Sequence, residues 1–195
     1  MKYNKTVLIT VAIVAVACLS ILCFFLGTSK GTRVAVDFSL SVENAVEESK
    51  YDFLGSSLSS YICSLSSELG LDSDLVVAIL MVENPEFNPD ATNKNENGTI
   101  DVGLFQLNDK YLWTDFKNDY WFDNIELNPF NWKHNTYIAL HHIAFLQNKM
   151  KVQDDVIMAY NGGYGAVMNG EIKPNTKVYL AKVKNNLFLL KGGAL

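Results

Sequence analysis

A single glutamate stands where an apolar helical segment has to end. Residues 75–82 are almost entirely apolar, Glu83 follows them, and Pro85 prevents the helix from continuing. The negative end of a helix dipole and apolar neighbours both disfavour a charged carboxylate at that place. We therefore expect a raised pKa for Glu83, which is the property that a general acid working near neutral pH needs.

The remainder of the chain after residue 55 also shows helical spacing of its apolar residues. The expected fold class is all-α, with at most one small β-hairpin at the turn formed by Asn97 and Gly98. Asp72 or Ser73 is expected to cap the helix that carries Glu83. Further helices are predicted at 58–69, 131–150, 153–160 and from Thr176 onwards.

The N-terminus carries a long apolar run without charges, residues 7–27. About 20 apolar residues suffice to cross a bilayer. The sequence predicts one transmembrane helix in residues 1–27, which precedes a tether at 28–55 and a domain at 56–195. A cleaved signal peptide is the alternative, although its apolar core is usually shorter.

Charge suggests where the domain lies. Lys2 and Lys5 precede the apolar run, which favours a cytoplasmic N-terminus and a domain outside the cytoplasmic membrane, in the periplasm. The chain has a net charge of −5, and removing these two lysines leaves −7 for the exported part. An acidic domain without a basic stripe is not expected to bind nucleic acid. Cys63 is the single cysteine of the domain, and its helical pattern predicts a buried thiol.

Four sequence blocks follow one another in the domain. They are Glu83 with Phe87-Asn88-Pro89-Asp90-Ala91, then Gly103-Leu104-Phe105-Gln106, then Ala159-Tyr160-Asn161-Gly162-Gly163, and finally Thr176-Lys177-Val178-Tyr179. In this order they resemble the soluble-lytic-type lytic transglycosylases of the lysozyme-like superfamily, glycoside hydrolase family 23. The loop at 95–101 is most similar to members attached to secretion and pilus machines, so an envelope-spanning protein machine is an expected partner.

The resemblance implies a lysozyme-like fold, peptidoglycan glycan strands as substrate, and no cofactor. Glu83 would be the acid and then the base that cleaves the bond between N-acetylmuramic acid and N-acetylglucosamine and closes a 1,6-anhydro ring. Gln106 and Asn161 would bond to the sugars, and Tyr160 would orient Glu83. The matched blocks imply four further substrate-binding residues, namely Gly103, Asn93, Phe105 and Tyr179.

Departures from the family pattern leave alternatives open. Asn84 replaces the serine that follows the glutamate, and one residue is inserted before Phe87. Glu86 is a second acid beside that position, and it is expected to be solvated because it follows Pro85. A lysozyme-like hydrolase and a catalytically weak wall-binding or assembly module therefore stand beside the transglycosylase. Asp101 is interpreted as a loop residue.

No metal site is expected. The loop at 93–101 lacks the leading aspartate and the bidentate glutamate of a calcium loop. His134, His141 and His142 share one predicted helix but lack the spacing of a zinc motif, so packing is the expected role of His142. Core packing is also expected for Trp113, Trp121 and Trp132 rather than stacking on sugars.

Overall fold

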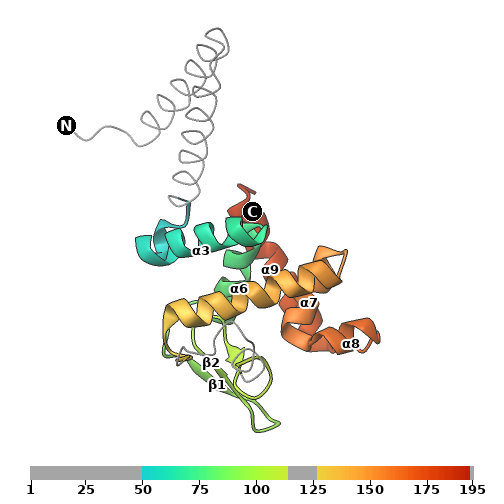
Figure 1. Ribbon diagram of the computed structural model, residues 1–195. Coiled ribbons are helices and arrows are strands. Elements are labelled where there is room, and N and C mark those ends of the chain that lie inside the picture. Colours follow the sequence, from blue (N-terminus) through green and yellow to red (C-terminus); the bar gives the residue numbers. More distant parts are fainter. Residues whose placement is uncertain (1–49, 114–126, 194–195) are drawn as a thin grey trace, which may run out of the picture. The chain divides into compact units, whose positions relative to one another are not determined.

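The computed structural model describes residues 50–113 and 127–193. They form mostly helices and one small antiparallel sheet (Figure 1). The chain divides after Cys63 into two units, and each is described by itself. The helices are η1 (Asp52–Leu54), α3 (Ser56–Leu69), α4 (Ser73–Glu83), α6 (Trp132–Lys149), α7 (Gln153–Gly162), α8 (Tyr164–Met168) and α9 (Pro174–Leu190), and the strands are β1 (Thr92–Lys94), β2 (Ile100–Val102) and β3 (Leu107–Asn108).

The N-terminal predictions fall mostly outside the described part of the chain. Among residues 50–113 and 127–193, no helix combines the length and apolarity that a membrane crossing needs. The predicted anchor at 1–27 and most of the predicted tether at 28–55 lie outside those ranges. Near the end of the tether, η1 is formed and the side chain of Tyr51 is fully buried. Cys63, which comes later in α3, is buried as predicted.

Helix α4 is the central helix of the second unit. Asp72 caps it, because its side chain accepts a hydrogen bond of 2.9 Å from the backbone of Asp74. Every residue from Leu75 to Leu80 is buried, as expected for a helix that is apolar all round. The helix ends at Glu83, one residue before the cap at Asn84. The predicted acid therefore sits at the end of a buried helix.

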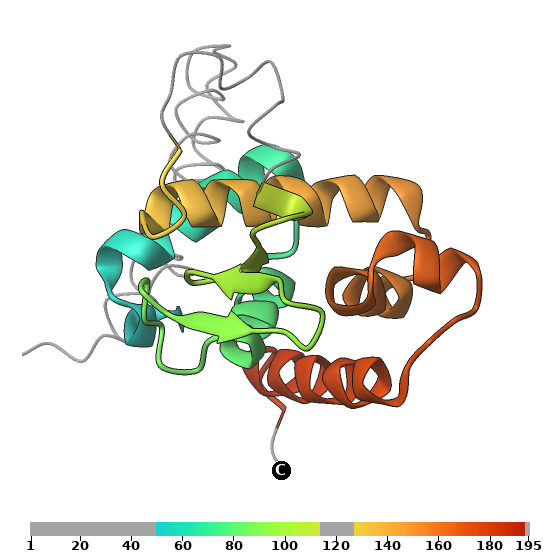
Figure 2. The same cartoon turned by 90° about the horizontal axis from the view of Figure 1, so that it is seen from below.

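The C-terminal helices pack on α4 through α9. Helix α9 packs along α4 and also along α7, and Figure 2 shows α9 and α7 side by side. Helix α7 also contacts α6 and the short helix α8. Pro174 occupies the first turn of α9, where the missing N–H costs no hydrogen bond.

In the view of Figure 2, the small sheet lies to the left of α7 and above α9. Its strands are antiparallel in the order β1-β2-β3, and Asn97 with Gly98 forms the predicted turn between β1 and β2. Val102 and Leu107 form one cross-strand pair and are buried. Asp101 forms the neighbouring pairs, and its side chain points to the opposite face of the sheet.

The helical prediction is confirmed, with corrections at its edges. The sheet has a third strand beyond the expected hairpin, and Asp101 lies in a strand rather than a loop. Helix α8 was not predicted, and α9 begins two residues earlier than expected. The predicted helices at 131–150 and 153–160 correspond to α6 and α7, with Asn131 as the cap of α6.

Candidate active site

Glu83 lies at the C-terminal end of α4 and is bonded to a tyrosine from α9. The hydroxyl of Tyr179 donates a hydrogen bond of 2.7 Å to Oε1 of Glu83. The pKa of Glu83 is raised from 4.5 to about 7, chiefly by burial; the hydrogen bond from Tyr179 lowers it, and the charge of Asp101 raises it. Because burial is the largest effect, the carboxyl group holds its proton up to neutral pH.

Two tyrosines stand beside this carboxyl group with different hydrogen-bond partners. Tyr179 is buried, and burial together with the charge of Glu83 keeps the pKa of its phenol well above the usual value. We expected Tyr160 to orient Glu83, but its hydroxyl donates to the backbone carbonyl of Phe105 at 3.0 Å. Burial and, to a smaller extent, the charge of Glu83 raise the pKa of Tyr160 well above its usual value. The direct hydrogen bond to Glu83 thus comes from Tyr179.

Asn84 explains how the chain accommodates the inserted residue. Its side chain is buried and exchanges two hydrogen bonds with the backbone of Asn88, one of 2.7 Å and one of 3.2 Å. This clamp closes a turn in which Phe87 has a positive φ of 52°. Glu86 projects from the turn and is exposed, as predicted. The departure from the family pattern therefore shapes the loop and leaves Glu83 at the helix end.

The sheet presents a row of polar side chains. Asn93 in β1 pairs with Asp101 in β2, which pairs with Asn108 in β3. Residues directly opposite in an antiparallel sheet project on the same face, so the three side chains are neighbours. The amide of Asn108 donates to Asp101 at 2.7 Å and to Thr99 at 2.8 Å. The row is linked to Glu83 electrostatically, since Asp101 raises its pKa.

The segment that follows β2 is shaped by a glycine and an asparagine. Gly103 has a φ of +77°, and a Cβ added there would lie 2.2 Å from the side-chain nitrogen of Asn135. Asn135 is fully buried in α6, accepts from the backbone of Phe105 at 2.8 Å, and donates to the carbonyls of Val102 and Pro129. No other residue fits at Gly103 without displacing Asn135.

Gln106 also adopts a positive φ, 48°. Its amide nitrogen donates to the carbonyl of Gly103 at 2.8 Å and to that of Ala91 at 3.3 Å. These bonds fix the side chain, and they leave the amide oxygen as the atom that a ligand would meet. If Gln106 contacts a sugar as expected, its amide oxygen accepts a hydrogen bond from a hydroxyl or amide group of the sugar. Phe105, in contrast, is fully buried and contributes its backbone to the site.

The tyrosine-asparagine block ends α7 where it meets α9. Asn161 is exposed, and its side-chain oxygen accepts a hydrogen bond of 3.1 Å from Thr176. A Cβ at Gly162 would lie 3.0 Å from the Thr176 hydroxyl, which is why a glycine suits that close approach. Gly163 has a φ of +88° and terminates the helix. Gly162 is therefore the last residue of α7, and Gly163 is its cap.

The model of a known protein family matches the part of the chain that carries this site. It is that of the transglycosylase SLT domain, and it matches residues 60–179, more than half of the chain. The chain belongs to the transglycosylase SLT domain family. This confirms the family that the four sequence blocks indicated.

A curated lysozyme is similar over a shorter stretch. Lysozyme c-1 of Anopheles gambiae is 50% identical over 38 residues. The match covers 19% of this chain and 26% of the lysozyme, so the chain spans about a quarter of that relative's length.

Within this SLT domain, two of the predicted residues are linked to Glu83. Tyr179 bonds to it directly, and the charge of Glu83 contributes to the raised pKa of Tyr160. Asp101, which was interpreted as a loop residue, raises the pKa of Glu83 through its charge. Asn93 is exposed at the end of the sheet row, and Asn161 at the end of α7. Asn135 and Asn108 were not predicted, and they bond to the segment after β2 and to the carboxylate of Asp101.

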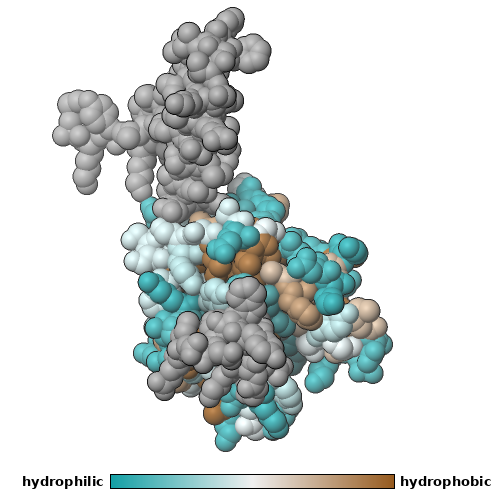
Figure 3. Space-filling view, viewed as in Figure 1, coloured by the Kyte–Doolittle hydropathy of each residue, from teal (hydrophilic) through white to brown (hydrophobic). Residues whose placement is uncertain are grey.

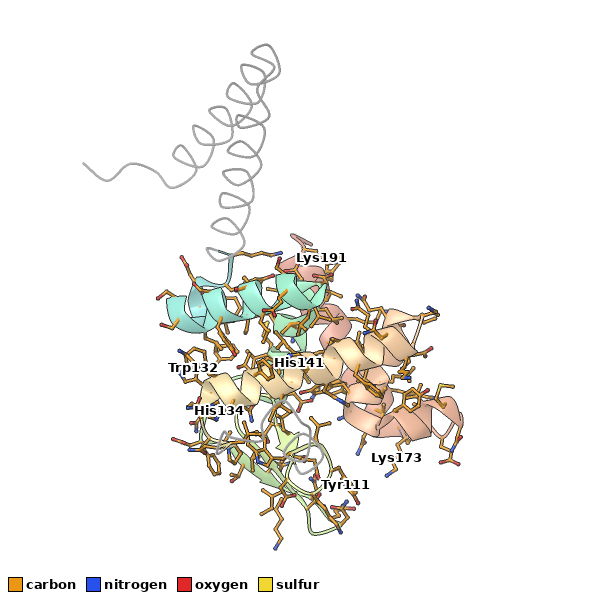
Figure 4. The ribbon with its side chains drawn as sticks, viewed as in Figure 1. Tyr111, Trp132, His134, His141, Lys173 and Lys191 are labelled. Atoms are coloured by element: carbon orange, nitrogen blue, oxygen red, sulfur yellow. The ribbon has the colours of Figure 1, made fainter. Side chains whose placement is uncertain are left out.

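The histidines and tryptophans of the SLT domain have other partners. His134 accepts from the backbone of Asn128, and the ring of His141 lies 4.2 Å from that of Tyr137, on a different turn of α6 (Figure 4). Within the described ranges, no three His, Cys, Asp or Glu residues are placed to hold a metal. Trp113 is buried and Trp132 is half-buried, whereas Trp121 lies outside those ranges.

Proposed function

We propose that this SLT domain is a peptidoglycan lytic transglycosylase with Glu83 as both acid and base. The observation that carries the proposal is the raised pKa of Glu83, about 7, at the end of a buried helix. A carboxyl group that is still protonated near neutral pH can give its proton to a glycosidic oxygen.

The proposed reaction needs one carboxyl group. Protonated Glu83 donates to the oxygen between N-acetylmuramic acid and N-acetylglucosamine, and the bond to the muramic C1 breaks. The acetamido oxygen of the muramic sugar stabilises the cationic carbon. Glu83, now charged, takes the proton of the muramic 6-hydroxyl, whose oxygen bonds to C1 and closes a 1,6-anhydro ring. Tyr179 stabilises the charged form of Glu83 through its hydrogen bond of 2.7 Å.

A hydrolase is the second candidate, and Asp101 favours it. Most glycosidases use two carboxyl groups, and lysozymes combine a protonated acid in an apolar setting with an ionised partner. Asp101 acts on Glu83 through its charge and is held by Asn108. The similarity to a lysozyme agrees with this arrangement. In this reaction water replaces the 6-hydroxyl, with Asp101 as the second carboxylate.

The products separate the candidates. The full-length chain, solubilised in mild detergent, is incubated with purified peptidoglycan, and the released sugars are analysed by mass spectrometry. Anhydro-muramic ends support the transglycosylase, and reducing muramic ends support the hydrolase. Glu83→Gln should lower either activity by about 10³-fold, as loss of a general acid does.

A matched control is Glu86→Gln, because Glu86 lies three residues away in an exposed turn. That variant should keep the activity of the unaltered chain. If neither product forms while the folded chain binds glycan, the third alternative, a wall-binding or assembly module, replaces both enzymes. An equal loss of activity in Glu86→Gln would contradict the assignment of Glu83.

We also propose that residues 1–27 anchor the chain in the cytoplasmic membrane, with the SLT domain in the periplasm. The apolar run at 7–27 and the lysines before it support this. An envelope-spanning machine that needs a local opening in the wall is the proposed partner. The full-length chain should stay with membranes after an alkaline wash. Recovery of a shortened soluble form that begins beyond Gly27 would contradict the anchor.

A further inference from the structure

A continuous series of aromatic rings leads away from the candidate active site. The ring of Tyr160 lies 5.8 Å from that of His142, and His142 stacks on Phe145 at 6.3 Å with an angle of 15° between the rings. Phe145 meets Tyr164 edge to face at 6.2 Å. The series joins α7, α6 and α8, and it begins at the tyrosine that bonds the backbone of Phe105.

The series changes from buried to exposed along its length. Tyr160 and His142 are half-buried, whereas Phe145 is 46% exposed and Tyr164 is 36% exposed. Burial lowers the pKa of His142 to about 4, so its ring is neutral at physiological pH. Figure 3 shows apolar surface over the C-terminal half of α6.

The exposed end offers a flat and weakly polar surface. The ammonium of Lys149 lies 5.7 Å from the centre of the Phe145 ring, within the range of a cation–π contact. Single exposed apolar residues are common on proteins, but aromatic rings in mutual contact beside a polar residue are typical of ligand sites. Neither Phe145 nor Tyr164 belongs to the residues that act on Glu83.

We propose that Phe145 and Tyr164 bind the glycan strand at sugars beyond the pair that is cleaved. We call these two residues the aromatic surface. The pyranose ring of an N-acetylated sugar has an apolar C–H face that packs on an aromatic ring, while its hydroxyl groups remain in water. The inference rests on the proposed function, because it takes the same polymer as the substrate.

The ring contacts that connect the aromatic surface to Tyr160 favour a glycan strand as its ligand. A strand bound at Glu83 continues in both directions past the cleaved bond, so part of it must leave the site over neighbouring surface. Two ring contacts, from Tyr160 to His142 and from His142 to Phe145, connect the aromatic surface to the site. A second protein docked there would compete with the strand for the same rings, and the test below separates the two occupants.

The binding test uses the inactive background Glu83→Gln in the full-length chain. Binding of long, purified glycan strands is compared with binding of a tetrasaccharide of the same sugars. Adding Phe145→Ala and Tyr164→Ala should weaken strand binding by about tenfold, the effect of two lost aromatic contacts. The tetrasaccharide should lose clearly less affinity, because it extends less far beyond the site.

Met168→Ala is the matched control. Met168 is in α8 like Tyr164 and is 60% exposed, but it takes no part in the ring series. It should leave strand binding unchanged. In the active background, the paired aromatic variant should raise KM for strands and leave kcat unchanged, which a general loss of structure would not do.

Three results would overturn the inference. They are unchanged strand binding in the paired variant, an equal loss in Met168→Ala, and an equal loss for strand and tetrasaccharide. Failure of the proposed function has a different signature: the unaltered chain would release no sugars, yet the difference between the paired variant and its control would still be measured. If the Glu83→Gln chain binds no glycan at all, both proposals fail together.

Discussion

The two sides of the candidate site differ in what surrounds their polar groups. On the helical side, the half-buried Glu83 accepts a hydrogen bond of 2.7 Å from the buried Tyr179, and desolvation raises the pKa of Glu83. On the sheet side, Asn93 is exposed, and Asp101 and Asn108 are partly exposed and bonded to each other. The helical side therefore has the larger effect on the protonation of Glu83, whereas the sheet side has polar groups that are open to solvent.

A carboxyl group with a raised pKa and a group that binds a ligand need different surroundings. Removing water raises the pKa of a carboxyl group, but it also removes access for a ligand. The negative charge of Asp101, on the sheet side, adds to the effect of burial. Each of the following variants changes one side and leaves the other in place.

Gly103→Ala should have the largest effect on stability, because it disturbs the contact between the segment after β2 and Asn135 of α6. The added Cβ would meet Asn135 at 2.2 Å, and the positive φ of +77° is unfavourable for alanine. Strain and overpacking together should cost about 3 kcal/mol of unfolding free energy, measured by urea denaturation.

Gly98→Ala is the matched control for that variant. It also has a positive φ, +83°, but nothing lies within 4 Å of its added Cβ. The expected cost is about 1 kcal/mol. Equal costs at the two glycines would show that Asn135 does not restrict Gly103.

Glu83→Gln should change how the stability of the helical side depends on pH. The pKa of Glu83 is about 7 in the folded chain and near 4.5 when unfolded. Folding is therefore favoured by the proton at low pH, and that contribution, up to about 3 kcal/mol, is lost as pH rises through 7. Glutamine carries no charge, so the variant should lose less stability between about pH 5 and about pH 9.

Urea denaturation at the two pH values measures this difference, with Glu86→Gln as the control. The exposed Glu86 should leave the pH dependence of the unaltered chain in place. If Glu83→Gln and the unaltered chain lost the same free energy over that interval, the carboxyl group would not be buried as described.

Asp101→Asn tests how far the sheet side affects Glu83. Removing its charge should lower the pKa of Glu83, so the upper pH limit of activity should move to lower pH. For a transglycosylase, activity at about pH 5 should fall by less than about tenfold, whereas a hydrolase that uses Asp101 should lose on the order of 100-fold or more. Rates of sugar release across pH measure both effects.

Tyr179→Phe should have the smallest effect, and its sign is opposite. The hydrogen bond from Tyr179 lowers the pKa of Glu83, so its loss should move the upper pH limit of activity to higher pH. Stability should fall by about 1 kcal/mol. Tyr111→Phe is the control, because that tyrosine is 57% exposed and does not act on Glu83 (Figure 4). A shift toward lower pH would contradict the hydrogen bond to Glu83.

The sequence predicts those parts of the fold that are determined by residues close together in the chain. The cap at Asp72, the end of α4 before Pro85 and the turn at Asn97 and Gly98 each depend on a few neighbouring residues. The helices with clear apolar spacing were predicted for the same reason. Strand β3 escaped prediction because two residues cannot show an alternating pattern.

The parts that the sequence does not predict depend on distant residues. Asn135 looks like a polar position on a helix, yet it is buried and bonds residues 30 and 33 positions away. Tyr160 and Tyr179 are both plausible partners of Glu83 in the sequence, and only the packing of α9 on α4 selects Tyr179. The effect of Asp101 likewise arises from the pairing of strands.

The central claim is that burial keeps Glu83 protonated near neutral pH, and a direct titration of its carboxyl carbon tests it. Carbon NMR of the full-length chain with labelled glutamate, recorded across pH, is compared with the same spectra of Glu83→Gln. We predict one carboxyl group with a pKa of about 7 that is absent from the variant. A pKa near 4.5 for Glu83 would contradict the account, because the carboxylate would then be charged where it has to act as an acid.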